Sequence, residues 1–288
     1  MIKYIKRKDL DVKKYNACID NARQSRVYAL SWYLDIVADN WDVLVLDDYK
    51  AVMPIPWKQK YLIKYVTQPL FCQQLGVFSS ISLTKTDIMA FFKKIPFRFK
   101  KVSLHINPSN PIGKNCITKK NYMLDLHKDY QSLSANFSKT RRQRVQAGKK
   151  NNLEVKPVAI DKLLEIQKDN YNYKGFSKTI LLKLSTYILA NRSGAVLGVY
   201  DQNEVLGGGL FITHKDRIVY LFSSFSSRGR KYQAASFLIN RIIEQNQQEN
   251  KILDFEGGNI KSIGDFFKSF GSQTEPFYHY SKNRFIKI

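Results

Sequence analysis

The sequence predicts a mixed α/β protein of two domains, and three observations carry this prediction. In the second half, the spacing of apolar and polar residues predicts strands and helices in the order β-α-α-β-β-β-α-β-α-β. The first half contains a weaker echo of that order, and the strongly basic segment Ser138–Lys150 lies between the halves. A chain of 288 residues is long enough for two domains of about 100 to 150 residues each.

The elements of the second half follow from local patterns. Asn152–Pro157 alternates like a strand, and Ile160–Asn172 carries apolar residues at helical spacing. Ser177 is a typical N-cap for a second helix that ends near Ala190. The run Gly207–Gly209 lies within a strand pattern, which indicates a bulge rather than a phosphate loop. We expect three strands joined by polar turns, then a long helix, a buried strand, a helix and a last strand, at 195–200, 205–212, 217–222, 231–247, 252–256, 260–270 and 277–281.

The first half repeats part of this order. A helix at Tyr28–Val37 precedes two strands, Trp41–Leu46 and Ala51–Pro56, joined by a polar turn. This hairpin resembles the one around 201–204, which lies about 154 positions later, so internal duplication is a reasonable hypothesis. We place an N-terminal domain at 1–128, a basic connecting helix at 129–150 and a C-terminal domain at 151–288.

Positive charge is concentrated in the middle third of the chain. The sequence contains 47 Lys and Arg against 24 Asp and Glu, a net charge of +23. Residues 51–150 hold 19 basic and 3 acidic side chains, a net of +16. Such a local excess favours an anionic partner over a uniformly solubilising charge.

Composition argues against several classes of protein. No apolar run approaches the roughly 20 residues of a membrane-spanning helix, and the first ten residues do not resemble a signal peptide. The cysteines Cys18, Cys72 and Cys116 are widely spaced, and the four histidines are scattered, so we expect no disulfide framework and no metal site. A cytoplasmic location is the simplest expectation.

Three local sequences resemble the GCN5-related N-acetyltransferase (GNAT) fold, and most closely the tandem-domain acyltransferases related to the Fem peptidyltransferases. The first is Ser138-x-x-Arg-Arg-x-x-x-x-Ala-Gly148, which is similar to the basic helix that opens the second domain of that family. The second is Arg228-Gly-Arg-Lys-Tyr-Gln-Ala-Ala-Ser-Phe-Leu238, and the third is Asp254-Phe-Glu-Gly-Gly-Asn259 followed by Phe266–Gly271. The resemblance implies two GNAT-like domains, each with a mostly antiparallel central sheet flanked by helices. It makes the first domain degenerate and gives the second the donor cleft.

The resemblance also implies a set of site residues. The loop before the long helix would hold the pyrophosphate of the donor, where helix N–H groups and cations form an anion site. That loop provides Arg228, Gly229, Arg230, Lys231, Gln233 and Ala235. A carboxylate at the end of the buried strand would take the proton of the attacking amine, which gives Glu256 and Asp254 as catalytic candidates. The substrate-binding candidates are Tyr220, Ser223, Ser224, Tyr232, Asn259, Arg141 and Arg142.

Each catalytic candidate has a structural alternative. Glu256 can instead cap the following helix or pair with a lysine, and Asp254 can form a salt bridge to the basic middle segment. Asp254 precedes Glu256 by two residues, so strand alternation predicts that both side chains lie on one face of the strand and can share a site.

The sequence leaves three functions open. The first is an N-acyltransferase that uses an activated ester, with a slight preference for acyl-CoA as co-substrate, and an amine acceptor. The second is a Fem-like peptidyltransferase that uses aminoacyl-tRNA. It is favoured by the large side chains of Lys231 and Gln233, which stand where GNAT loops usually have glycine or alanine. The third is a non-catalytic protein of the same fold that binds an anionic ligand.

Overall fold

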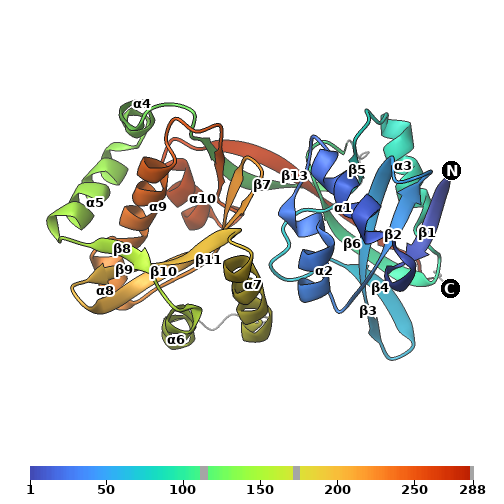
Figure 1. The fold of residues 1–288 in the computed structure, drawn as a ribbon, viewed down its shortest axis with the longest axis horizontal. Helices are drawn as coiled ribbons and strands as arrows, with labels where there is room; N and C mark the ends of the chain where they lie inside the picture. The colour runs from blue at the N-terminus through green and yellow to red at the C-terminus, as the bar shows by residue number, and fades with distance from the viewer. Residues whose placement is uncertain (111–115, 171–175, 286–288) are drawn as a thin grey trace. The chain divides into compact units, whose positions relative to one another are not determined.

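The structure, a computed structural model, describes residues 1–110, 116–170 and 176–285 (Figure 1). It divides into two compact units, unit 1 at 1–119 and 276–288 and unit 2 at 120–275. The sequence places the boundaries differently, because it assigns 276–288 to the second domain and 120–128 to the first. The reason lies in two strands, β7 (Cys116–Asp125) and β13 (Gln273–Asn283), within which the chain passes from one unit to the other.

Unit 1 is a sheet in the order β1-β2-β3-β4-β6-β13, with a short strand β5 beside β3. All neighbours are antiparallel except β4 and β6, which are parallel. The expected hairpin of the first half is present as β2 and β3. The elements are β1 (Ile2–Lys6), α1 (Val12–Asn21), α2 (Ser31–Val37), β2 (Asn40–Leu46), β3 (Ala51–Lys60), β4 (Ile63–Thr67), β5 (Phe78–Ser79), α3 (Lys85–Lys94) and β6 (Phe99–Ile106), with 3₁₀ turns at Arg7–Asp9 and Val27–Ala29.

Unit 2 is a sheet in the order β8-β9-β10-β11-β12-β7, in which only β11 and β12 are parallel. Figure 1 shows α5, α9 and α10 on one face of this sheet and α6 and α7 on the other. The elements are α4 (Tyr130–Ala135), α5 (Lys139–Lys150), β8 (Glu154–Pro157), α6 (Ile160–Asn170), α7 (Lys178–Ala190), β9 (Gly194–Asp201), β10 (Glu204–His214), β11 (Arg217–Phe225), α8 (Ser227–Lys231), α9 (Ala234–Gln245), β12 (Ile252–Asp254) and α10 (Lys261–Lys268).

The two units share one topology. In each, a strand and two helices precede a meander, the last strand of the meander pairs in parallel with the next strand in the order of the sheet, and a strand from the other half of the chain completes the sheet. That last strand is β13 in unit 1 and β7 in unit 2. The shared order is what the duplication hypothesis predicts. Mixed sheets flanked by helices confirm the expected α/β class.

The long helix expected at 231–247 is present as α9, which begins three residues later, and a separate short helix, α8, precedes it. α8 ends at Lys231 and α9 begins at Ala234, because Gln233 between them has a left-handed backbone (φ 61°). Neither glycine nor proline marks the residue that separates α8 from α9, so the sequence gives no sharp start for the long helix. The bulge expected near Gly207–Gly209 is confirmed by register shifts in β10 on both sides of the run.

Two histidines face each other in unit 1. His105 of β6 is opposite His279 of β13, with ring centroids 5.3 Å apart, and the Nδ1 atom of His105 lies 3.2 Å from the carbonyl oxygen of Gln73. Burial lowers the pKa of His105 to about 4, and the neighbouring His279 adds to the effect. His105 is therefore neutral in the folded protein at pH 7.

This neutral histidine predicts a loss of stability in mild acid. His105 takes up a proton near pH 6.5 in the unfolded chain but only near pH 4 in the folded protein. Its contribution to the free energy of unfolding is therefore largest above pH 6.5 and decreases as the pH falls from 6.5 to 4. Between pH 7 and pH 5 we expect the free energy of unfolding to fall by about 1–2 kcal/mol from this group. Urea unfolding of wild type and His105→Gln at both pH values measures it. An equal loss in the variant would contradict the assignment.

Candidate functional site

In unit 2, the parallel strands β11 and β12 are paired over only the first part of β11. Their pairing runs from Arg217 opposite Ile252 to Val219 opposite Asp254 and ends there. β11 continues to Phe225, whereas β12 stops at Asp254. Beyond Val219, no described strand pairs with the edge of β11 that faces β12.

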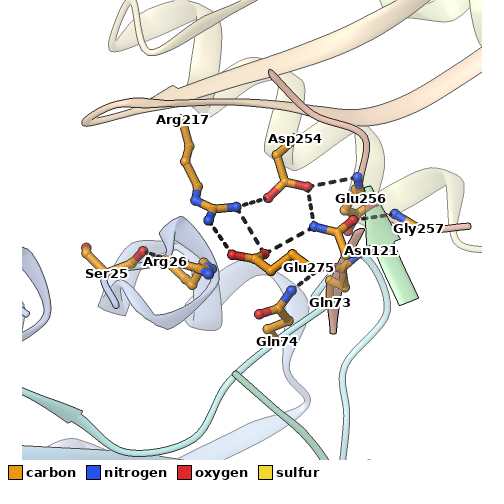
Figure 2. A network of polar contacts seen from close by, with 10 residues as sticks. All are labelled: Ser25, Arg26, Gln73, Gln74, Asn121, Arg217, Asp254, Glu256, Gly257 and Glu275. Atoms are coloured by element: carbon orange, nitrogen blue, oxygen red, sulfur yellow. Dashed lines mark hydrogen bonds and ion pairs between the residues drawn. The ribbon is translucent and has the colours of Figure 1, made fainter. Parts of the chain in front are cut away.

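A buried charged network lies where the strands part. Figure 2 shows the guanidinium of Arg217 reaching two carboxylates: Nη1 lies 2.7 Å from Oδ2 of Asp254, and Nη2 lies 2.6 Å from Oε1 of Glu275. Nδ2 of Asn121 donates to Oδ1 of Asp254 at 2.9 Å. All four side chains are buried. Burial alone would lower the pKa of Arg217, but the charges of Asp254 and Glu275 outweigh it and raise the pKa.

The same network fixes the backbone that follows β12. Oδ1 of Asp254 accepts the N–H of Glu256 at 2.9 Å, and Oδ1 of Asn121 accepts the N–H of Gly257 at 2.9 Å. Glu256 has a left-handed backbone (φ 54°), which costs a non-glycine residue about 1–2 kcal/mol. Such a conformation persists when its surroundings over-determine it, and the two hydrogen bonds do so here. Glu256, a half-buried side chain, is thereby held just past the point where β11 and β12 part.

The two catalytic candidates are in different situations. Asp254 is 1% exposed, and its carboxylate is engaged by Arg217, Asn121 and the N–H of Glu256. Its ion pair is with Arg217 and not with the basic segment 138–150, which corrects the sequence-based alternative. Because the chain leaves the strand conformation at Glu256, the expected placement of both side chains on one strand face is not found either. Asp254 positions Glu256 by accepting the hydrogen bond of its backbone N–H.

The candidate donor loop is shaped by packing. Ser226 caps α8 by accepting the N–H of Gly229 at 3.0 Å. A Cβ on Gly229 would lie 2.2 Å from the carbonyl oxygen of Leu206 in β10, so only glycine lets α8 lie against that strand.

The cations of this loop have partners within unit 2. Arg228 forms ion pairs with Asp201 and Glu204 of the β9–β10 turn. Arg230 donates to the carbonyl oxygen of Phe225 at 2.9 Å, and Lys231 is exposed.

The N-terminus of α9 is uncapped by a side chain. Gln233 occupies the N-cap position, but its amide donates to the carbonyl oxygen of Arg230 at 3.1 Å and makes no cap hydrogen bond. The first N–H groups of any α-helix have no acceptor within the helix, and the helix dipole makes that end positive. Ala235 lies in this first turn and is partly buried. The start of α9 therefore has the chemistry of an anion site.

The substrate-binding candidates of β11 and α8 differ in their burial and contacts. Tyr220 stacks on Phe211, with ring centroids 5.0 Å apart. Ser223 is half-buried. Ser224 is buried, and its hydroxyl has no hydrogen-bond partner among the described residues. Tyr232 is the C-cap residue of α8, and the guanidinium carbon of Arg228 lies 5.2 Å from its ring centroid.

The three remaining candidates have structural contacts. The amide of Asn259 accepts from the N–H of Lys120 at 3.0 Å and donates to the carbonyl oxygen of the same residue at 3.2 Å. Arg142 donates to the carbonyl oxygens of residues 135 and 137, near the end of α4.

Arg141 is buried between α5, α9 and α10. It donates to the hydroxyls of Ser236 and Ser269 and lies 4.2 Å from the ring centroid of Phe266. Burial lowers its pKa to about 10. The inward face of the basic helix thus serves packing, and its exposed face carries the remaining cations.

The sequence analysis missed the charged centre of this site. Arg217, Glu275 and Asn121 lie on three strands that are far apart in the sequence, and none belongs to a local motif. The available signal was a charged residue at the start of the apolar run Arg217–Phe222. Among the described residues, no group of three or more His, Cys, Asp or Glu is placed to hold a metal ion, and no helix has the length and apolar character to cross a membrane.

Comparisons with known proteins identify the fold. No protein-family model matches the sequence, and no curated protein matches it. Among solved structures, FemX has a TM-score of 0.69 at 10% identity over 96% of each chain. A tandem GNAT protein from the clavulanic acid biosynthesis pathway has a TM-score of 0.55 at 8% identity over the full length of both chains. The two units are GNAT-like domains.

A third relative in structure is L-PGS from Bacillus licheniformis, with a TM-score of 0.58 at 11% identity over 96% of this chain and 93% of that one. The expected resemblance to tandem GNAT proteins related to the Fem proteins is therefore confirmed for the fold. The donor site that the sequence analysis places in the loop before α9 stays a prediction.

Proposed function

We propose that the protein is an N-acyltransferase whose second GNAT-like domain moves an acyl or aminoacyl group from an activated ester to an amine. The parting of β11 and β12 beyond Val219 carries the proposal, because an acyl group that enters between the two strands would meet backbone N–H groups of β11 that can polarise its carbonyl. Solved structures named as a tandem GNAT protein and as FemX share this fold.

The chemistry assigned to the site needs few groups. The amine nitrogen attacks the carbonyl carbon of the ester or thioester, and the carbon–oxygen or carbon–sulfur bond breaks. Glu256 accepts the proton that the amine loses, and that proton passes to the leaving group. Asp254 and Asn121 act as positioning residues, since they hold the backbone of Glu256 and Gly257.

Acyl-CoA is the donor that we propose first. Its pyrophosphate matches the positive dipole and the N–H groups at the start of α9, where the N-cap residue makes no side-chain cap hydrogen bond. Calorimetric titration with acetyl-CoA and longer acyl-CoA thioesters tests the proposal, and saturable heat is the expected result. The matched variant Ala235→Glu puts a carboxylate into the first turn of α9 and should weaken binding at least tenfold by repulsion. No heat with any acyl-CoA, or unchanged binding in that variant, would contradict the assignment.

Aminoacyl-tRNA is the second candidate donor, and two observations favour it. Arg228 is already paired with Asp201 and Glu204, which leaves less positive charge for a pyrophosphate. The exposed face of α5, which packs beside α9, carries several Lys and Arg side chains. Binding of charged tRNA should then weaken steeply between 50 and 200 mM salt. Absence of tRNA binding at low salt would exclude this donor. Binding of acyl-CoA or aminoacyl-tRNA without transfer to any amine would instead support the non-catalytic alternative.

A further inference from the structure

Three hairpins of the molecule share one turn geometry and differ in one respect. Each joins its strands through two residues, of which the first has a left-handed backbone: Tyr61 (φ 52°), Gln202 (φ 52°) and Lys215 (φ 54°). Such turns favour glycine, asparagine and aspartate. In unit 2 the turn pairs are polar, Gln202-Asn203 and Lys215-Asp216, whereas the β3–β4 hairpin of unit 1 has Tyr61-Leu62.

The Tyr61-Leu62 turn is almost completely exposed. Tyr61 is 85% exposed and Leu62 is 93% exposed, and Figure 1 shows the β3–β4 hairpin projecting from the rest of unit 1. Neither side chain contributes to the core, and neither suits the turn. Local rules broken without a gain in packing are expected where a surface has a function.

Other exposed apolar side chains lie at the same end of the sheet. The parallel pairing of Lys64 with Phe99 places the starts of β4 and β6 together, and β13 ends beside them because the N–H of Arg284 donates to the carbonyl oxygen of Lys100. Phe97, just before β6, is 67% exposed, and Phe285, just after β13, is 52% exposed. We call this set the tip surface, and it consists of Tyr61, Leu62, Ile63, Phe97 and Phe285.

A small hollow continues the tip surface toward the sheet. Its volume is about 300 Å³, and its walls include Ile63, Tyr65 and Phe285, with Lys101 beside them. The apolar surface thus extends from the turn into a recess and is not confined to two isolated side chains.

The tip surface is surrounded by positive charge. The amine of Lys60 lies 5.7 Å from the ring centroid of Tyr61, and Lys100 and Arg284 lie 5.0 and 5.6 Å from that of Phe97. The sequence contains no Asp or Glu from residue 49 to residue 86. Exposed aromatic and aliphatic side chains ringed by cations are the combination that binds an anionic lipid surface.

We propose that the β3–β4 hairpin docks the protein on an anionic membrane surface, with the tip surface entering the headgroup region and the surrounding cations contacting lipid phosphates. RNA fits less well, because its phosphate backbone is bound by charged and polar groups and makes no favourable contact with the aliphatic side chains of Leu62 and Ile63. This inference is independent of the proposed transferase activity.

Vesicle binding of the full-length protein tests the proposal. In co-sedimentation, wild type should bind vesicles of phosphatidylcholine with 30% phosphatidylglycerol and not vesicles of phosphatidylcholine alone. The variant Tyr61→Gln/Leu62→Asn carries the turn pair of the β9–β10 hairpin, so the fold should be kept, while vesicle affinity should fall about tenfold or more. Replacing Lys60 and Lys100 with glutamine should weaken binding about fivefold for each lysine.

Leu189→Ser is the matched control, because Leu189 is 50% exposed on α7 of unit 2 and should not affect binding. Thermal unfolding of each variant checks the fold. The proposal is overturned by absence of vesicle binding, by equal binding to neutral vesicles, or by unchanged binding in the turn variant. If only the lysine variants lose affinity, the surface is a general polyanion site such as RNA would use. If the turn variant instead abolishes self-association in sedimentation velocity, the occupant is a second copy. Either result contradicts the membrane assignment.

Discussion

Arg217→Met is expected to destabilise unit 2 by about 3–5 kcal/mol, the largest effect of a single substitution that we predict. The substitution removes a buried cation that pairs with both Asp254 and Glu275. The two buried carboxylates then lose this ion pair, and Asp254, which accepts the N–H of Glu256, is no longer held in place by the guanidinium. Urea unfolding monitored by circular dichroism measures the change.

An exposed ion pair of the same unit provides the control. Lys261 and Asp265 lie 3.0 Å apart on α10 in contact with solvent, so Lys261→Met should change stability by less than about 0.5 kcal/mol. If Arg217→Met costs no more than this control, the network does not hold the site together and the account of Glu256 fails.

Glu256→Gln is expected to reduce the rate of transfer by about 10²- to 10⁴-fold, the contribution typical of a positioned general base. The amide keeps the shape of the side chain, so donor binding and the free energy of unfolding should be nearly unchanged. Steady-state turnover with the donor identified by calorimetry measures the effect, together with urea unfolding of the same sample.

The matched control is Glu165→Gln, which removes a carboxylate from an exposed ion pair with Lys162 on α6. It should leave turnover unchanged. A Glu256→Gln protein with more than a third of wild-type turnover would assign the proton transfer to another group or to water.

Local signals predicted most elements of the fold. The cap at Ser177, the polar turn pairs of unit 2 and the strand alternation in 152–157 all act over a few residues, and the structure contains the elements they predict. Pairing between distant strands left no such signal. The sequence analysis did not predict that β7 joins the sheet of unit 2 and β13 the sheet of unit 1. Alternation shows that a segment is a strand but not which strand it pairs with.

The candidate site divides in the same way. The position of Glu256 after a buried strand and before two glycines could be recognised locally, and the structure places it past the end of β12. The residues that hold it could not, since Asn121, Arg217 and Glu275 meet only once the sheet has formed. The left-handed backbone of Gln233, which separates α8 from α9 and leaves the start of α9 uncapped, also has no sequence signal of its own.

Amide hydrogen exchange with and without saturating acetyl-CoA tests the central claim most directly, because the claim assigns the donor to particular N–H groups. Bound donor should slow exchange in the peptide covering the end of β11 and the first turn of α9, residues 220–240. Exchange in α1 of unit 1 should stay unchanged. Unaltered exchange across 220–240 at saturation, or protection confined to unit 1, would contradict the assignment of the donor site to the second GNAT-like domain.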